Sequence, residues 1–269
     1  MPKLGLFKPP RLRAVRKCGL TGKTAVVAGV MGAMMAKSSR SSFIVQSAVA
    51  GMAEKRYPAN MTAHHILARR CWIFDLDGTL TLPVHDFAAI RSALGMTESD
   101  ADILQFLASL PAAEAAARHA RLIEIEYELA AKTAAAPGAG RLLDQLLRRD
   151  ARVGILTRNT REIALHTLGQ IGLKGYFTSD AILGREEAAP KPHPEGIEKL
   201  LAAWGSAPDE TVMVGDYLFD LQVGRAAGTA TIHVDRSGAF RWPELADLAV
   251  ATLEELAVAL AHAVPMPSL

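Results

Sequence analysis

The chain has 269 residues, of which 50% are hydrophobic and 22% are charged. A chain of this length can bury the core of one large α/β domain together with an inserted domain, which excludes a small scaffold stapled by disulfides or metals. The two cysteines, Cys18 and Cys71, provide neither a disulfide framework nor a Cys/His metal site. We therefore expect a reducing, cytoplasmic compartment.

Positive charge is concentrated at the start of the chain. Nine Lys or Arg residues precede the first acidic residue, Glu54, so the charge through Glu54 is +9 − 1 = +8 and the remainder carries +2 − 8 = −6. An acidic remainder argues against a nucleic-acid partner. Residues 1–60 are predicted to be a basic extension. It is either disordered or the product of a misassigned start codon, in which case Met61 would be the first residue. The apolar run 24–36 also permits a targeting segment, but it is short for a membrane span, and we expect no membrane association.

The apolar run 71–74 predicts a buried strand of a parallel sheet, and it is followed by Asp75, Asp77 and Gly78. Residues two apart share one face of a strand, so both carboxylates should emerge together at its carboxyl end, where open α/β sheets bind ligands. Neighbouring carboxylates repel, so such a pair needs a cation or one protonated member. The alternative is a plain solvated turn at Asp77-Gly78.

Residues 83–137 have a helical pattern and predict an inserted helical domain, with residues 61–82 and 138–269 forming the core domain. Three helices are expected in the insert, with boundaries marked by Gly95, by a capping box at 97–100 and by Pro111. His85 and Asp86 stand at the entry to the insert. They either contact substrate or form a surface hinge and a helix cap.

From residue 138 onward, strand and helix patterns alternate. Strands are expected at 153–157, 181–183, 211–214, 231–234 and 248–250. A first helix is expected to end at about residue 149, and two others are expected at 194–204 and 218–227. A further helix is expected to begin at a cap formed by Asn159 and Glu162 and to end at Gly172. The last helix is expected to follow a cap formed by Thr252 and Glu255. The alternation predicts an α/β fold, a doubly wound parallel sheet covered by helices on both faces.

Later strand ends carry further candidate residues. The Thr157 hydroxyl can donate to a phosphoryl oxygen, although threonine is also common in strands because of its β propensity. Arg158 and Asn159 follow it, and they either contact substrate or start the next helix. Lys191 is an exposed loop lysine or a cation that neutralises a phosphoryl group, and the prolines on both sides, which restrict its backbone, favour the second reading. His193 either caps the following helix or helps to bind substrate.

The segment 215–220, Gly-Asp-Tyr-Leu-Phe-Asp, follows an apolar strand and opens a helix. Asp216 is a candidate metal ligand, and Asp220, one helical turn later, is a partner that acts through another residue or through water. Oxygen ligands alone suit Mg²⁺. Alternatively, Asp216 caps the helix, and Asp220 is an acidic residue of the first turn, where the helix dipole favours it. This alternative explains each residue alone, but not why both occur together with Asp75 and Asp77.

Four segments together resemble the signatures of the haloacid dehalogenase-like (HAD) hydrolases: residues 74–80, Thr157, Lys191 and residues 215–220. The resemblance covers about residues 70–262 and points to the phosphoglycolate phosphatase-like branch, which implies a Rossmann-like core with a small helical cap after the first strand. It implies that Asp75 is the phosphorylated nucleophile and Asp77 the general acid and base. The dehalogenase branch lacks the second aspartate, so Asp77 favours phosphoester chemistry.

The resemblance also implies a Mg²⁺ site formed by Asp75, Asp216 and the backbone carbonyl of Asp77, with Thr157 and Lys191 acting on the phosphoryl group. Further residues are expected to support these groups or to contact substrate, namely Gly78, His85, Arg158, Asn159 and Asp220.

The resulting prediction is a Mg²⁺-dependent phosphatase that hydrolyses a small phosphomonoester, phosphoglycolate-like or a sugar phosphate, through an aspartyl phosphate. Its partner would be a small phosphorylated metabolite, and the sequence carries no signature of oligomeric state. One alternative is a sugar phosphomutase of the same fold, which would return the phosphoryl group to sugar. Another is a non-catalytic HAD-fold binding protein, which should have lost one of the key residues; Asp75, Asp77, Lys191 and Asp216 are all present.

Overall fold

A computed structural model describes residues 63–97 and 102–263, so the predictions for residues 1–60 lie outside the described part of the chain. The described residues form a six-stranded parallel sheet with the order β3-β2-β1-β4-β5-β6. Its strands are β1 (Cys71–Phe74), β2 (Arg152–Leu156), β3 (Ile182–Leu183), β4 (Thr211–Gly215), β5 (Ala230–Val234) and β6 (Leu248–Val250). Within those two ranges, no helix combines the length and the hydropathy needed to cross a membrane.

Strand β1 lies inside the sheet, between β2 and β4. Its last residue, Phe74, is in register with Ile155 of β2 and Val214 of β4. The chain runs outward from β1 through β2 and β3 and then returns to the other side of β1 as β4. Open α/β sheets bind ligands at such a reversal of strand order, beyond the carboxyl ends of the strands. The residues that directly follow β1, β2 and β4 therefore meet at one edge of the sheet.

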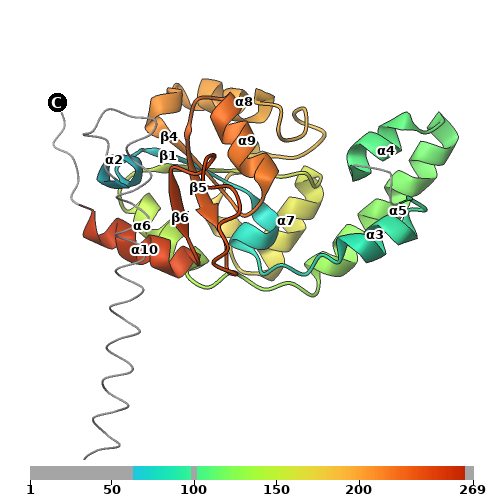
Figure 1. Ribbon diagram of the computed structural model, residues 1–269, viewed down its shortest axis with the longest axis horizontal. Coiled ribbons are helices and arrows are strands. Elements are labelled where there is room, and N and C mark those ends of the chain that lie inside the picture. Colours follow the sequence, from blue (N-terminus) through green and yellow to red (C-terminus); the bar gives the residue numbers. More distant parts are fainter. Residues whose placement is uncertain (1–62, 98–101, 264–269) are drawn as a thin grey trace, which may run out of the picture. The chain divides into compact units, whose positions relative to one another are not determined.

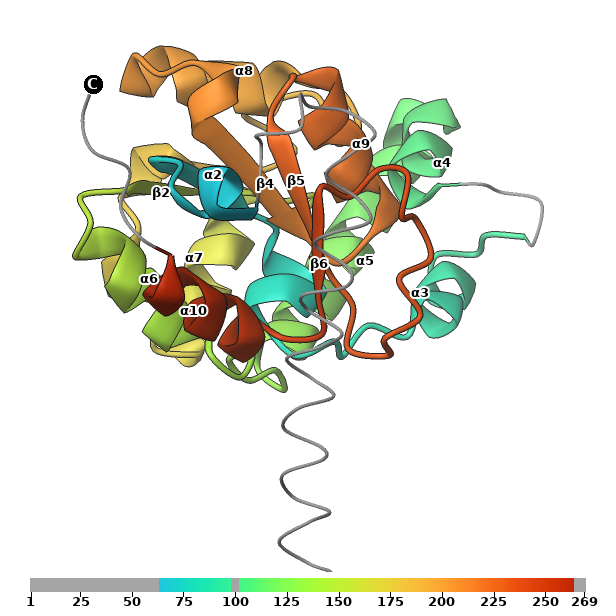
Figure 2. The ribbon, with the colours of Figure 1, turned by 60° about the vertical axis from the view of Figure 1, so that its left-hand side comes forward.

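Helices cover both faces of the sheet, which confirms the predicted doubly wound fold (Figures 1 and 2). The face that contains Trp72 and Phe74 is covered by α6 (Ala139–Leu147), α7 (Arg161–Gln170) and α10 (Leu253–His262). The opposite face, which contains Ile73 and Met213, is covered by α8 (Glu195–Trp204) and α9 (Leu218–Ala226). Because both faces are buried, β1 is apolar throughout rather than alternating with polar residues.

The insert between β1 and β2 contains the three expected helices, α3 (Phe87–Ala93), α4 (Ile103–Ser109) and α5 (Ala112–Ala130). They bury an apolar cluster of their own, which includes Leu94, Leu107 and Leu122. Figure 1 shows these helices grouped beside the helices that cover the sheet. The domain boundaries at residues 83 and 137 stay predictions. Shorter helical segments are α2 (Ala63–Leu67), η2 (Leu76–Leu80), η3 (Lys174–Tyr176), η4 (Ser179–Ala181) and η5 (Pro208–Glu210).

The start of α4 differs from the prediction. The capping box expected at 97–100 lies mostly outside the described residues, and α4 begins only at Ile103. The Asp102 carboxylate accepts hydrogen bonds from the backbone amides two and three residues later, which makes Asp102 the cap of this helix. Pro111 immediately precedes α5, one residue before the helix begins.

The cap of α7 also differs from the prediction, because Thr160 takes the place expected for Asn159. Thr160 Oγ1 accepts a hydrogen bond from the Ile163 amide at 3.3 Å. The Asn159 side chain points instead to Asp77, to which its amide donates at 2.8 Å. At α10, Thr252 is the cap, as predicted.

Candidate active site

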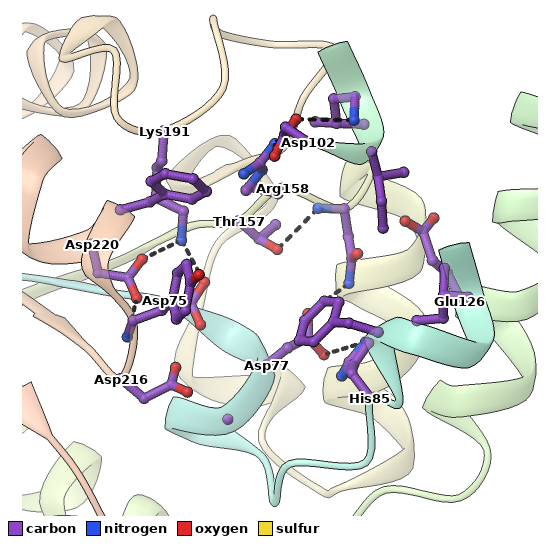
Figure 3. Close-up of a pocket in the computed structure, with 18 of the residues that line it drawn as sticks. Asp75, Asp77, His85, Asp102, Glu126, Thr157, Arg158, Lys191, Asp216 and Asp220 are labelled. Carbon is purple, nitrogen blue, oxygen red and sulfur yellow. Dashed lines mark hydrogen bonds and ion pairs between the residues drawn. The ribbon is translucent and has the colours of Figure 1, made fainter. Parts of the chain in front are cut away.

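Lys191 joins two carboxylates at the carboxyl edge of the sheet (Figure 3). Its Nζ donates to Asp75 Oδ1 at 2.5 Å and to Asp220 Oδ1 at 2.6 Å. Asp75 directly follows β1, Asp220 lies in the first turn of α9, and Lys191 belongs to the loop between β3 and α8. Burial lowers the pKa of Lys191, but the charges of Asp220 and Asp75 outweigh this effect and raise it, so the amine stays protonated.

Asp220 uses both of its carboxylate oxygens within the protein. Oδ1 accepts from Lys191, and Oδ2 accepts from the Tyr217 backbone amide at 3.0 Å. Asp220 is also almost completely buried. It therefore holds Lys191 at this edge of the sheet, and its predicted role of acting through another residue stays a prediction.

Three carboxylates approach one another closely enough to share a cation. One oxygen each of Asp75, Asp216 and Asp220 lies within 4.8 Å of the other two. Burial raises the pKa of Asp216 to about 8, and the charges of Asp75 and Asp220 add to the shift. Burial likewise raises the pKa of Asp75 to about 7, against the opposing charge of Lys191. A hard cation with oxygen ligands would relieve this repulsion, so the residues present fit Mg²⁺.

Gly78 makes room for this cluster. Its φ of +87° lies in the left-handed region that favours glycine, and a Cβ here would stand 2.4 Å from Asp216 Oδ2. Asp216 Oδ1 accepts a hydrogen bond from Thr79 Oγ1 at 3.0 Å. The side-chain cluster contains Asp75, Asp216 and Asp220. The metal contact predicted for Asp77 is through its backbone carbonyl and stays a prediction.

Asp77 faces the insert side of the site (Figure 3). Its Oδ2 accepts from Asn159 Nδ2 at 2.8 Å, and its Oδ1 lies 3.9 Å from His85 Nε2. Burial raises the pKa of Asp77 to about 6, while Lys191 and the Asn159 hydrogen bond oppose the shift. A carboxyl group that titrates near neutrality can both donate and accept a proton. Burial lowers the pKa of His85, so its ring is neutral at pH 7.

The remaining predicted residues divide between the site and the helix caps. Thr157 is buried at the end of β2 and lines the same cavity, where its Oγ1 accepts from the Asn159 backbone amide at 3.1 Å. Asp86 caps α3 by accepting from the amide three residues later, which matches the capping alternative. His193 Nδ1 likewise accepts from the Glu195 amide at 3.3 Å, as a residue at a helix start would.

In the described ranges two arginine–carboxylate pairs connect the insert to the core, and sequence reasoning missed both. Arg158 Nη2 donates to both carboxylate oxygens of Asp102 at 2.7 Å. Arg185 donates through Nη1 and Nη2 to the two oxygens of Glu126 at 2.7 Å and 3.0 Å, and both side chains are only 8% exposed. The partners are 56 and 59 residues apart in the chain, so no local pattern links them.

The aspartates and the lysine of this site line one cavity of about 410 Å³. Asp75, Lys191 and Asp216 line the part at the edge of the sheet, and Asp102 and Glu126 line the part formed by the insert (Figure 3). The arrangement offers a buried carboxylate, a cation beside it and a second carboxyl group that titrates near neutrality. These are the groups that a two-step transfer through a carboxylate requires.

Comparisons with known proteins identify the family of the chain. A family model for haloacid dehalogenase-like hydrolases matches residues 72–234. An uncharacterized hydrolase of Saccharomyces cerevisiae is 30% identical over 190 residues, which cover 68% of this chain and 87% of the yeast protein. A haloacid dehalogenase-like hydrolase domain-containing protein of Arabidopsis thaliana is 31% identical over 193 residues, which cover 68% of this chain and 77% of the plant protein. Pyrophosphatase PpaX of Bacillus pumilus is 36% identical over 114 residues, 42% of this chain and 48% of PpaX.

Solved structures share the fold. A hydrolase from Pseudomonas syringae has a TM-score of 0.57 and 23% identity, covering 72% of this chain and 98% of the other. A predicted phosphoglycolate phosphatase from Haemophilus somnus has a TM-score of 0.55 and 21% identity, covering 71% and 98%. The family model matches residues 72–234, and this range contains all four signature segments and most of the parallel sheet. The chain is an enzyme that belongs to the haloacid dehalogenase-like hydrolases.

Proposed function

We propose that this enzyme is a Mg²⁺-dependent phosphatase that hydrolyses a small phosphomonoester through an aspartyl phosphate on Asp75. The observation that carries the proposal is the contact between Lys191 Nζ and Asp75 Oδ1 at 2.5 Å, beside Asp216 and with Asp77 two residues away. A cation at this distance favours the carboxylate form of Asp75 against the burial that raises its pKa, and it offsets negative charge that develops on a phosphoryl group.

The residues divide the reaction into two displacements. In the first, an Asp75 oxygen forms a bond to phosphorus, the bond from phosphorus to the leaving oxygen breaks, and Asp77 gives that oxygen its proton. In the second, Asp77 takes a proton from water as the water attacks phosphorus, which releases phosphate and restores Asp75. The raised pKa of Asp77, about 6, suits both roles. Mg²⁺, when bound by Asp75 and Asp216, would supply further positive charge at the phosphoryl oxygens.

Other residues prepare the two aspartates. Asn159 holds the Asp77 carboxylate through its 2.8 Å hydrogen bond, and Asp220 holds Lys191 against Asp75. The Thr157 hydroxyl lies at the end of β2, where it can donate to a phosphoryl oxygen while it accepts from the Asn159 amide. We further propose a small phosphorylated metabolite as the substrate.

The test is phosphate release by the full chain from a panel of phosphomonoesters, with Mg²⁺ and with EDTA. We expect release to depend on Mg²⁺ and to fall by a factor on the order of 10³ or more in Asp75→Asn, as for removal of a nucleophile. Asp209→Asn, the same substitution at an exposed position of η5, is the matched control and should retain activity.

Release that survives unchanged in Asp75→Asn would contradict the aspartyl-phosphate route. A mutase would instead show turnover that depends on a sugar bisphosphate and yields isomerised sugar phosphate. Folded protein that releases no phosphate from any ester of the panel would contradict the proposed phosphatase function.

A further inference from the structure

Aromatic side chains are exposed at the mouth of the active-site cavity. Phe87 of α3 is 62% exposed and Tyr217, which precedes α9, is 49% exposed. They are the two most exposed large hydrophobic side chains in the described ranges, and both line this cavity. Leaving two such rings in water at one opening is unfavourable unless something covers them.

The apolar lining continues from these rings into the insert. Its main members are Phe87, Ile90, Leu104, Leu122, Tyr217 and Phe219. They come from α3, α4, α5 and the start of α9, so the cavity has apolar walls on both the insert side and the core side. This lining begins where the phosphoryl-binding groups end, in the space that the leaving group of a phosphomonoester would occupy.

The charged groups in the same part of the cavity already have partners within the protein. Asp102 accepts two hydrogen bonds from Arg158, and Glu126 accepts two from Arg185. Arg91 donates to a backbone carbonyl of the insert at 3.4 Å. A sugar in this space would place most of its hydroxyl groups against apolar side chains, with only the spare lone pairs of these carboxylates to accept from them, which is unfavourable in a buried site. A second anionic group on the substrate would meet the carboxylates of Asp102 and Glu126, and Arg158, which also lines the cavity, is already paired with Asp102.

The rings at the mouth are held in place by neighbours. Phe87 stacks on His85 with 5.6 Å between ring centroids and an interplanar angle of 19°. Tyr217 packs edge-on against Phe219 at 5.3 Å and against Trp242 at 5.5 Å. Walls supported in this way need little ordering when a ligand arrives, so contact with them adds efficiently to affinity.

We infer that the substrate is a phosphomonoester whose leaving group is a compact apolar alcohol, aromatic or branched aliphatic, and neither a sugar nor a short carboxylate. The inference rests on the phosphatase function proposed above and narrows its substrate class. The phosphoryl group lies against Lys191 and Asp75, and the apolar group extends between Phe87 and Tyr217. Water leaves the apolar walls and the apolar group together when the substrate binds.

Turnover provides the first test, using esters of primary alcohols so that the reacting bond is of one kind. The full chain with Mg²⁺ is given 2-phenylethyl phosphate and 3-methylbutyl phosphate, then glucose 6-phosphate and phosphoglycolate, with methyl phosphate as the smallest substrate. We expect kcat/KM to be about tenfold or more higher for the two apolar esters than for the other three, because apolar contacts of this size discriminate by such factors.

Variants locate the preference in the walls. Phe87→Ala should lower kcat/KM for 2-phenylethyl phosphate about tenfold more than it lowers kcat/KM for methyl phosphate, because only the phenyl group loses an aromatic contact. Leu147→Ala removes another exposed apolar side chain, on α6 and away from the cavity, and should change neither substrate.

A binding experiment keeps the inference testable apart from catalysis. Inert 2-phenylethylphosphonate and 2-carboxyethylphosphonate are titrated into the full chain by calorimetry in Mg²⁺, and the phenyl compound should bind about tenfold more tightly. Equal or tighter binding of the carboxylate compound, or a kcat/KM for glucose 6-phosphate or phosphoglycolate that equals that of the apolar esters, would overturn the inference while leaving the phosphatase function in place. Tight binding of the phenyl compound without turnover of any ester would support the apolar site and overturn the phosphatase function.

Discussion

The buried ion pair between Arg185 and Glu126 holds α5 of the insert against the core, and its removal should be strongly destabilising. The two hydrogen bonds of 2.7 Å and 3.0 Å join side chains that are each 8% exposed. Arg185→Met keeps the apolar stem but leaves the Glu126 carboxylate buried without its partner. Breaking a buried pair in this way costs about 3–5 kcal/mol, so we expect the free energy of unfolding to fall by about 3 kcal/mol or more.

Part of that loss belongs to a second contact, because Arg185 Nη1 also donates to the Arg158 backbone carbonyl at 3.0 Å. A double-mutant cycle separates the two effects. In Arg185→Met/Glu126→Gln the uncompensated charge is gone, while the carbonyl still lacks its donor. The double variant should therefore be more stable than Arg185→Met alone by about 1–2 kcal/mol, the lower range for leaving a buried group unsatisfied.

The destabilisation should also depend on pH, with a sign set by Glu126. Burial raises the pKa of its carboxyl group, and the hydrogen bonds and charge of Arg185 oppose that shift. An acid whose pKa is raised by folding binds its proton more tightly in the folded state, so stability falls as pH rises from the ordinary value through the raised one. Without Arg185 the pKa rises further. Arg185→Met should therefore lose more stability at pH 8 than at pH 5, and the double variant should not.

Urea unfolding followed by far-ultraviolet circular dichroism at both pH values measures these differences. The matched control is Arg121→Met on α5, where Arg121 Nη1 lies 2.9 Å from Glu124 Oε2 and the side chains are 45% and 64% exposed. An exposed pair contributes little, so the control should lose less than about 0.5 kcal/mol. Equal losses for Arg185→Met and Arg121→Met, or a loss that does not change with pH, would refute the reasoning.

The active site supports further predictions. Gly78→Ala should weaken Mg²⁺ binding, measured by calorimetry, because its Cβ would stand 2.4 Å from Asp216 Oδ2; unchanged affinity would contradict the close packing. Asn159→Ala should lower kcat by about tenfold or more with little change in KM or urea midpoint, since it removes the donor that holds Asp77. A matching drop in stability would indicate a structural role instead. Mg²⁺ at 100 times its dissociation constant should stabilise the wild type by about 2.7 kcal/mol, an effect that Asp216→Asn should reduce.

Much of the fold follows from local patterns in the sequence. Each strand of the sheet is a short apolar run bounded by turn residues, and helices lie between most of them, which together favour a parallel sheet. The meeting of Asp75, Thr157 and Asp216 follows in turn, because parallel strands end at one edge. Lys191 stands in a loop, but the prolines around it mark a restricted backbone. The structure places all four around one cavity.

Other features depend on contacts between distant segments, which local patterns do not contain. Thr160 and Asn159 are adjacent and both are good helix caps, so propensity does not choose between them. The choice is made by Asp77, which accepts the Asn159 amide across a separation of 82 residues. Arg185 and Glu126 are likewise ordinary charged residues in their own segments. Their pairing becomes visible only when the insert lies against the loop after β3.

The two aspartates of the segment 215–220 show how similar residues acquire different roles. Asp216 and Asp220 are one helical turn apart and equally able to bind a cation by type. Asp220 is held by Lys191 and by the Tyr217 amide, so its charge is already balanced, whereas Asp216 has the Thr79 hydroxyl at 3.0 Å and a pKa raised to about 8. Asp216 and Asp75 are therefore the side chains that we propose would hold a cation, which would supply positive charge at the site. Asp220 keeps Lys191 directed at Asp75, so two residues 29 positions apart in the chain act on the same carboxylate.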